Sequence, residues 1–426
     1  MNYRGGPSSA FITQSATWDY LRGSEKDGYA ISLATNNTVY ESREVDPATA
    51  LGVTFRHAMS LGDNLLLRSS LSAVHDQTWS RRSDVLLWRE RIDYDIGQLR
   101  LFTAVDTKVT TLNERNIFIQ GGFLPYPESF VTVSVLPGVM YRLGFGEIGV
   151  SVTASRSVFR FETDYLGLRR NNDRIQPNLF ASATVAGIKL EGSLSLGRVT
   201  FPARDFDNLQ RLLYTAKATV PLDRLGLPFQ SFALELSSAR TFEDTTLPFS
   251  VINVSTLSEA RLTAKINAAN TLTTFARRKE DEYVGLGARA ITTWLGAEYG
   301  YTFDGGLTAV LAASWRRTQE TGNIPVSSFN IQIGMSKRIE FDRTTTAAAT
   351  PAPRIRSRLA RQTRSGVISD DWMASGLRIS IMISEVGGRE KRAAQSMDDC
   401  APHDIPLRAK CADLQPAPAW RVTPGG

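Results

Sequence analysis

The sequence predicts an all-β fold: a transmembrane, antiparallel, up-and-down β-barrel of about sixteen strands (range ~14–18), followed by a disordered C-terminal tail. Three observations predict this fold. Apolar and polar residues alternate with a period of two, the alternating segments are about a dozen residues long, and the connections between them alternate between short and long. A period of two indicates strands, because successive side chains of an extended chain point to opposite faces.

The alternation is clearest between Arg289 and Phe341. Residues 291–303 carry mostly apolar side chains at odd positions, and residues 307–316 and 329–341 repeat the pattern after a turn signal at Asp304–Gly306. Strands of soluble domains average roughly 5–6 residues, whereas a tilted strand that spans a bilayer needs about 9–11. The apolar faces begin or end in aromatic residues, which membrane–water interfaces select: Tyr299, Tyr301, Phe303, Trp315, Phe329 and Phe341.

The composition fits one barrel and excludes a helical membrane protein. The mean hydropathy is −0.18, and no run of about 18 apolar residues exists to form a membrane-spanning helix. Of the net charge of +6, residues 342–426 contribute +4, from 13 basic and 9 acidic residues. The predicted barrel is therefore nearly neutral, and nucleic-acid binding has little support from charge.

We divide the chain into three parts. Residues 1–27 form an N-terminal segment in which Ala10–Tyr20 could be an extra strand or a plug. Residues 28–341 form the barrel, and residues 342–426 form a basic, Pro- and Ala-rich extension. The sixteen predicted strands lie near residues 29–41, 49–59, 64–75, 85–96, 98–110, 130–143, 146–160, 175–186, 187–200, 209–222, 230–243, 254–266, 271–281, 288–303, 307–318 and 327–341.

The connections support a barrel independently, because short periplasmic turns and longer extracellular loops alternate in outer-membrane barrels. None of the loops is long enough to form a large plug, which favours an open lumen unless Ala10–Tyr20 folds inward. The short connections are Ser60–Asp63, Gly97, Gly144–Gly146, Ala186–Gly187, Asn267–Asn270 and Asp304–Gly306. The long ones are Thr111–Ser129, Asp164–Arg174, Phe201–Asn208, Asp244–Val254 and Arg317–Pro325.

The two ends of the chain differ from the predicted barrel. Thr344–Pro353 is low-complexity, Gly376–Glu385 alternates and could be one more strand, and the rest of the extension is expected to be disordered. Met1–Gly6 has no apolar segment of a signal peptide. Because an outer-membrane protein must be exported, we expect the true start of the protein to lie upstream.

The sequence contains no nucleophile elbow, P-loop, dinucleotide fingerprint or metal-spaced cluster, so it predicts no cofactor, no metal and no enzyme. His57, His75 and His403 share no neighbourhood. Cys400 and Cys411 could form one disulfide in an oxidising compartment. Zinc is disfavoured, because only His403 lies near these cysteines and the ligand spacing is wrong.

The polar face of the strands carries the candidate functional residues. If each apolar face points outward, a set of charged residues lines the lumen. Paired across strands, they would fill the lumen with ion pairs; an excess of basic side chains would instead favour anionic solutes. The basic members are Arg56, Arg68, Arg89, Arg91, Arg100, Arg142, Lys189, Lys217, Lys265, Arg316 and Arg338, and the acidic ones are Asp93, Asp106, Glu191, Glu235, Glu298 and Glu340.

The final hairpins read LGAEYGYTFDGGLTAVLAASWRRTQ (295–319) and FNIQIGMSKRIEF (329–341). Here the chain resembles β-barrel porin families of Gram-negative bacteria, including those encoded beside exopolysaccharide operons. The resemblance implies a location in the outer membrane, with outer-membrane lipid, the barrel-assembly machinery and an exopolysaccharide export system as expected partners. Phe341 is similar to the last-strand aromatic residue that such barrels present to that machinery.

The sequence favours a channel or porin-like protein that passes anionic solutes or an exported polysaccharide. The alternative is a non-conducting structural or docking protein whose lumen is blocked by paired charges. A third, less favoured hypothesis is a barrel enzyme, since such barrels can be lipases or proteases.

Overall fold

The fold is known from a computed structural model. It describes residues 10–24, 26–41, 47–78, 81–114, 127–164, 166–223, 227–247, 249–339 and 377–387, the last of these by their backbone only. Clustering of the chain separates 1–388 from 389–426, and all described residues belong to the first unit. Phe341, Cys400, Cys411 and His403 lie outside the described residues, so the predicted assembly signal and disulfide stay predictions.

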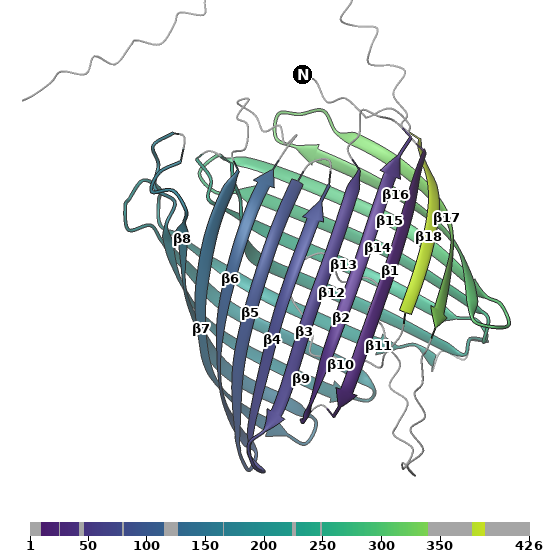
Figure 1. The fold of residues 1–426 in the computed structure, drawn as a ribbon, viewed down its shortest axis with the longest axis horizontal. Coiled ribbons are helices and arrows are strands. Elements are labelled where there is room, and N and C mark those ends of the chain that lie inside the picture. The colour runs from purple at the N-terminus through teal and green to yellow at the C-terminus, as the bar shows by residue number, and fades with distance from the viewer. Residues whose placement is uncertain are drawn as a thin grey trace, which may run out of the picture. The chain divides into compact units, whose positions relative to one another are not determined.

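Within the described residues the chain forms eighteen strands (Figure 1). The first nine are β1 (Ala10–Gly23), β2 (Gly28–Tyr40), β3 (Ala48–Ser60), β4 (Leu65–Gln77), β5 (Arg81–Ile96), β6 (Leu99–Glu114), β7 (Glu128–Leu143), β8 (Gly146–Phe159) and β9 (Asn172–Val185). The others are β10 (Ile188–Thr200), β11 (Leu209–Pro221), β12 (Ser231–Asp244), β13 (Ile252–Lys265), β14 (Asn270–Tyr283), β15 (Ala288–Thr302), β16 (Leu307–Glu320), β17 (Val326–Ile339) and β18 (Leu377–Gly387).

Each strand pairs antiparallel with the next one in the chain, and the ring closes where β1 pairs with β18 from Ala10↔Glu385 to Trp18↔Leu377. This confirms the predicted all-β, up-and-down barrel, and strands β2–β17 correspond to the sixteen predicted ones. The eighteen strands lie at the upper end of the predicted range of about 14–18. Both segments that the sequence left open, Ala10–Tyr20 and Gly376–Glu385, contribute wall strands, so the first of them is not a plug.

The two ends of the barrel differ in their connections. At one end, which we call the turn end, β3–β4, β5–β6, β7–β8, β9–β10, β13–β14 and β15–β16 are joined by four residues or fewer. At the other, the loop end, β6–β7 and β8–β9 are joined by thirteen and twelve residues. The sorting is not complete, because residues 222–230 make a longer turn-end connection, and β4–β5 and β14–β15 are joined tightly at the loop end.

Aliphatic side chains on alternate positions of the strands point outward and remain exposed, for example Leu71, Ile92, Val150 and Leu311. Near the turn end, several outward positions are aromatic: Trp18, Tyr20, Tyr94, Tyr141, Tyr299, Tyr301 and Phe303. An apolar belt bordered by aromatic residues on a closed sheet suits hydrocarbon, where every backbone polar group needs an internal partner. The protein is therefore an outer-membrane β-barrel.

No helix among the described residues is long and apolar enough to cross a membrane.

Two aromatic rings shape the inside of the wall near the turn end. The rings of Phe102 on β6 and Phe180 on β9 lie 6.0 Å apart and cover Gly138 on β7 and Gly149 on β8. A Cβ at Gly149 would lie 2.6 Å from the carbonyl oxygen of Val139 and in the ring of Phe180. Glycine is therefore required for the rings to lie against the backbone of the intervening strands.

We expect Gly149→Ala to lower the free energy of unfolding by about 1–3 kcal/mol, the usual cost of overpacking. Urea titration of the refolded barrel, followed by tryptophan fluorescence, measures the change. Gly52→Ala is the matched control, because Gly52 is also in mid-strand and a Cβ there meets nothing within 4 Å. Equal stability of the two variants would contradict the close packing of Phe180.

Candidate functional site

The predicted lumen residues lie on the side of their strands opposite to the exposed aliphatic belt. On β3, for example, Leu51, Val53 and Phe55 are exposed, so Arg56 lies on the inward face. The same alternation places inward Arg56, Arg68, Arg89, Arg91, Asp93, Arg100, Asp106, Arg142, Lys189, Glu191, Lys217, Glu235, Glu298 and Arg316. Arg338 belongs to β17, but its side chain is outside the described part, as is Glu340 altogether.

Several of these residues form ion pairs along the wall. Lys189 Nζ lies 2.6 Å from Glu191 Oε1, and Lys217 Nζ lies 3.3 Å from Glu235 Oε1. The guanidinium of Arg316 lies 5.3 Å from the centre of the Trp294 ring. In this part of the wall, Lys189 and Lys217 each lie within ion-pair distance of a carboxylate.

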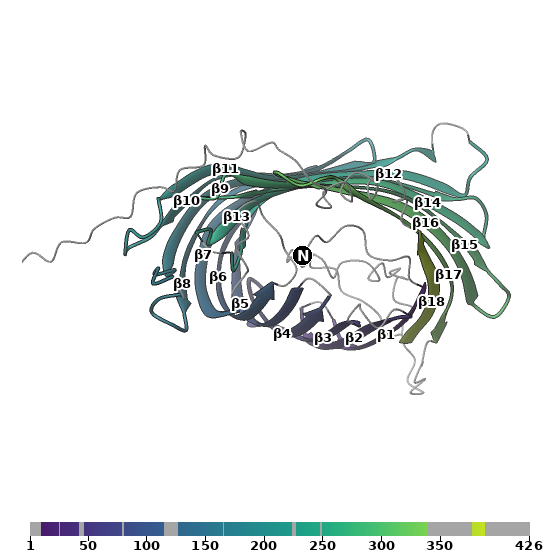
Figure 2. The same ribbon diagram turned by 90° about the horizontal axis from the view of Figure 1, so that it is seen from above.

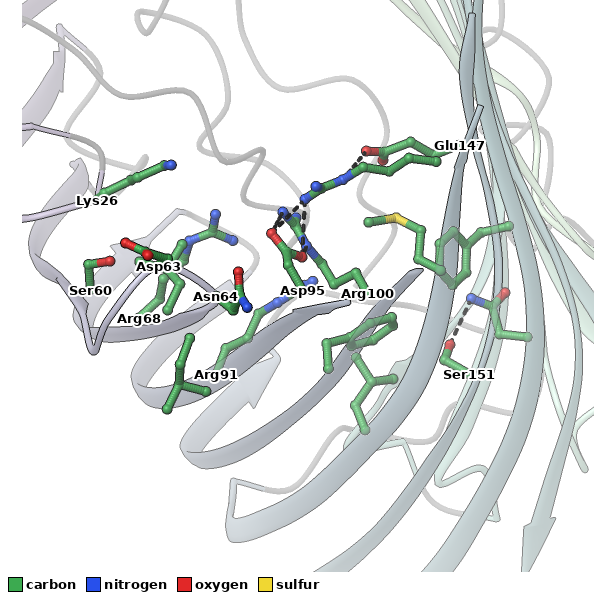
Figure 3. Close-up of a pocket in the computed structure, with 18 residues that line it drawn as sticks. Lys26, Ser60, Asp63, Asn64, Arg68, Arg91, Asp95, Arg100, Glu147 and Ser151 are labelled. Atoms are coloured by element: carbon green, nitrogen blue, oxygen red, sulfur yellow. Dashed lines mark hydrogen bonds and ion pairs between the residues drawn. The ribbon is translucent and has the colours of Figure 1, made fainter. Parts of the chain in front are cut away.

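On β4–β7 the balance is different, because guanidiniums outnumber the carboxylates between them. Asp93 bridges Arg68 and Arg91 at 3.2 and 2.9 Å. Asp95 bridges Arg100 and Arg142 at 2.6 and 3.1 Å, as Figure 3 shows for the labelled Asp95 and Arg100.

The four guanidiniums thus share two carboxylates. Glu147 lies 3.9 Å from Arg142, which is at the limit of an ion pair. Arg68 Nε is buried with no hydrogen-bond partner within the described residues.

These groups, apart from the buried Asp93, line a cavity of about 680 Å³ near the turn end, which we call the arginine recess. Its charged lining residues are Lys26, Asp63, Arg68, Arg91, Asp95, Arg100, Arg142 and Glu147, five cations against three anions. Leu136, Met140, Phe102 and Phe180 supply an apolar wall, and Arg91 stacks 4.6 Å from the centre of the Phe102 ring. The volume lies within the range of ligand-binding clefts, roughly 300–1,000 Å³.

The end of the β12–β13 hairpin leaves the wall. The ladder between β11 and β12 stops at Tyr214↔Arg240, although β11 begins at Leu209 and β12 continues to Asp244. Beyond that point β12 and β13 remain paired with each other, as far as Asp244↔Ile252. In the view along the barrel, β13 lies inside the ring of strands (Figure 2).

The infolded hairpin packs on inward-facing apolar residues of β6–β11. Phe242, Ile252 and Val254 join one buried cluster with Leu112, Phe130, Phe159, Val199 and Leu209. A Cβ at Gly197 would lie 2.5 Å from the Phe242 ring, so this glycine allows the ring to approach β10. Residues 244–247 and 249–254, which belong to a segment predicted as an extracellular loop, therefore occupy part of the lumen at the loop end. This corrects the expectation of an unobstructed lumen.

A buried arginine fastens the tip of the hairpin. Arg170, in the β8–β9 connection, donates to the carbonyl oxygens of Thr245, Leu247 and Ser250 at 2.8, 3.3 and 3.2 Å. It also pairs with Asp164 at 3.3 Å, and both side chains are almost completely buried. Because three carbonyls and one carboxylate surround the guanidinium, the contact fixes the tip in a single position.

The neighbouring residue Arg169 faces solvent and joins two loops. Its side chain lies 2.9 Å from Asp205 in the β10–β11 connection. Hydrogen bonds from the Arg169 side chain and then from its backbone N–H hold the pKa of Asp205 below its usual range. Because the folded-state pKa is lowered, this loop contact persists at neutral pH and is lost only as the pH falls through that lowered value.

Other chemistry is not assembled in the described part of the chain. No group of three or more His, Cys, Asp or Glu residues there could hold a metal ion. His75 Nδ1 lies 2.5 Å from Asp84 Oδ1, and His57 is on β3 away from that pair.

The sequence interpretation missed three features of the site. Asp95 and Glu147 share the inward faces of Asp93 and Arg142, so strand periodicity could have found them. Lys26 lies in a turn, where the alternation of a strand cannot predict which way a side chain points. Arg170 and Asp164 are in a connection, and nothing in the sequence indicates that they become buried together.

No protein-family model and no curated protein matches the chain.

Three solved structures illustrate what the chain is similar to. The siderophore receptor PirA from Pseudomonas aeruginosa is 8% identical with a TM-score of 0.43, covering 89% of this chain and 81% of that one. The FrpB iron transporter from Neisseria meningitidis (F5-1 variant, apoprotein form) is 9% identical with a TM-score of 0.43, covering 80% of this chain and 69% of that one. The copper transporter OprC is 8% identical with a TM-score of 0.40, covering 90% of this chain and 81% of that one.

These identities and TM-scores carry no functional argument, and none of the three proteins is described as an exopolysaccharide porin. The outer-membrane barrel stands on the closed ring and its apolar belt. The narrower porin family remains a proposal.

We expect Arg170→Gln to release the hairpin tip, because Asp164 and three carbonyls would lose their buried partner. Breaking a buried pair in this way costs about 3–5 kcal/mol. Hydrogen exchange in residues 245–251 should become faster while the wall strands stay protected. Arg169→Gln, next in the chain but exposed, should leave that exchange unchanged; faster exchange in both variants, or in neither, would contradict the anchoring role of Arg170.

Proposed function

We propose that the protein is an outer-membrane channel for anionic solutes and that the arginine recess is its anion contact. The observation that supports this is the sharing of Asp93 and Asp95 by four guanidiniums. Each guanidinium has five N–H donors and each carboxylate accepts only some of them, so donors remain for a passing carboxylate or phosphate. Rings of cationic side chains favour anions in pores.

The infolded hairpin restricts the path of such a solute. It covers the inside of β6–β11 at the loop end, where its apolar face is buried. Passage then follows the part of the lumen beside β1–β5 and β14–β18. The arginine recess lies near the turn end of β4–β9, so a solute meets the narrowed section and the basic wall at different depths.

An exported acidic polysaccharide is a second anionic cargo, since its carboxylates would meet the same guanidiniums. An exopolysaccharide export system and the barrel-assembly machinery, the latter reading Phe341, are the partners proposed with it. The compared proteins are a siderophore receptor, an iron transporter and a copper transporter. Among the described residues, the recess has no carboxylate-rich cluster suited to a metal cation.

A non-conducting structural or docking protein is the second candidate function. The burial of Thr246, Leu247 and Ser250 at the hairpin tip favours it, because a tip packed so completely does not behave as an exposed loop. If the hairpin and the paired charges together close the lumen, the barrel serves as a surface scaffold.

Single-channel recording of the full chain in planar bilayers separates the two candidates. We expect stable conductance with a reversal potential that indicates anion preference. In the double variant Arg100→Gln, Arg142→Gln, which leaves Asp95 without its two cations, the preference should shift toward cations.

Arg156→Gln is the matched control, because Arg156 lies on the outward face of β8 and its side chain is 68% exposed. It should leave the reversal potential unchanged. A folded barrel that never conducts would support the structural function, and cation preference in the wild type would contradict the anion channel.

A further inference from the structure

The departure of the β12–β13 hairpin leaves a step in the outer surface of the barrel. From Leu209 to Leu213, β11 has no ladder with β12. As β12 turns inward it stays paired with β13, and β13 stays paired with β14. The membrane-facing surface is therefore interrupted at the loop end between β11 and β14. Two features, one charged and one apolar, lie at this step.

The charged feature is an outer arginine cluster that consists of Arg240, Arg278 and Arg289 with Glu280 and Glu282. Glu282 lies 3.3 Å from Arg211 Nη2 and 3.6 Å from Arg240 Nη2. Glu280 pairs with Arg289 and lies 3.6 Å from Arg278. Three guanidiniums thus share two carboxylates in this cluster. Arg211 reaches Glu282 from the inward face of β11, which it shares with Leu209 and Leu213.

Strand register fixes the direction of these side chains. Arg278 pairs with Thr293, and Glu282 pairs with Arg289, on the same face of β14–β15 as the exposed Leu295. The Arg278 and Arg289 side chains are 61% and 56% exposed. All of these residues lie in the half of their strands nearer the loop end, where the barrel meets a membrane–water interface.

The apolar feature is an outer groove of about 610 Å³ directly below the cluster. Its floor is made of small side chains from four neighbouring strands, among them Ala216, Ser258, Ala260 and Ala276. Leu236 and Leu295 form its rims, and Arg278 belongs both to the groove and to the cluster. The groove is therefore continuous with the cationic group above it.

Electrostatics indicates what completes this site. An uncompensated arginine on the lipid face of a barrel costs about 2–4 kcal/mol at the bilayer midplane and less near the interface. The cluster has one positive charge more than its carboxylates neutralise, and Glu282 is also shared with Arg211. An anion held at the interface would compensate this excess charge.

We propose that the outer arginine cluster and the outer groove together bind one anionic membrane lipid. Its phosphate headgroup accepts hydrogen bonds from Arg240 and Arg278, and one acyl chain lies in the groove over the alanine and serine floor. A lipid fits better than a free anion because the groove is apolar, faces the membrane and adjoins the cations. The proposal does not depend on conduction, since none of these residues lines the arginine recess.

Native mass spectrometry of the full chain in detergent tests the proposal, with three lipids of identical acyl chains as probes: phosphatidylglycerol, phosphatidylcholine and diacylglycerol. We expect one phosphatidylglycerol to be retained per barrel and the other two to be retained about tenfold less, because charge-assisted hydrogen bonds need the net anionic headgroup. The double variant Arg240→Gln, Arg278→Gln should remove this preference.

Ala260→Leu fills the groove and leaves the cluster intact, so it should weaken retention of phosphatidylglycerol without affecting the arginines. Arg156→Gln, an outward arginine on β8, is the control and should retain the lipid as the wild type does. Heat-modifiable mobility in gels checks that each variant is folded. Equal retention of the three lipids by the wild type, unchanged retention in both site variants, or displacement of the lipid by inorganic phosphate alone would overturn the proposal.

Discussion

The structure depends on one constraint: in hydrocarbon, a β-sheet must leave no backbone edge unpaired. The chain meets it by pairing every strand with its neighbours and joining the last strand to the first through the β1–β18 ladder. Closure forces each strand to separate a lipid face from a lumen face. The exposed aliphatic belt and the inward charges are two consequences of the same geometry. Successive side chains of a strand point to opposite faces, so the residues next to an outward aliphatic side chain must point into the lumen.

The ladder between β11 and β12 is where the wall departs from this rule, and the departure organises the loop end. The freed end of the hairpin buries Phe242, Ile252 and Val254 inside the barrel instead of against lipid. Its tip carbonyls are satisfied by the guanidinium of Arg170. A local loss of strand pairing is thus offset by an apolar cluster and a buried ion pair, which narrow the lumen inside and leave a step outside.

The sequence predicted the wall well, because alternation is a local property: sixteen of the eighteen strands and the inward placement of residues such as Arg68 and Arg142 follow from it. The two remaining strands were ambiguous. Ala10–Tyr20 alternates weakly, and Gly376–Glu385 is separated from β17 by a long segment. The infolding of residues 244–247 and 249–254 could not be predicted, since it arises from contacts with Arg170 and β6–β11 that are distant in sequence.

Carboxylates shared by a larger number of arginines occur on both faces of the wall: two with four arginines inside, and two with three arginines outside. The surroundings decide what each group can bind. Inside, Arg68, Arg91, Arg100 and Arg142 line the arginine recess; in the proposed channel, water and salt would screen their excess charge and an anion could exchange rapidly. Outside, Arg240 and Arg278 lie beside hydrocarbon, where an excess charge is costly without a counterion. Identical chemistry therefore favours a transient anion in the lumen and a resident anionic lipid on the outer surface.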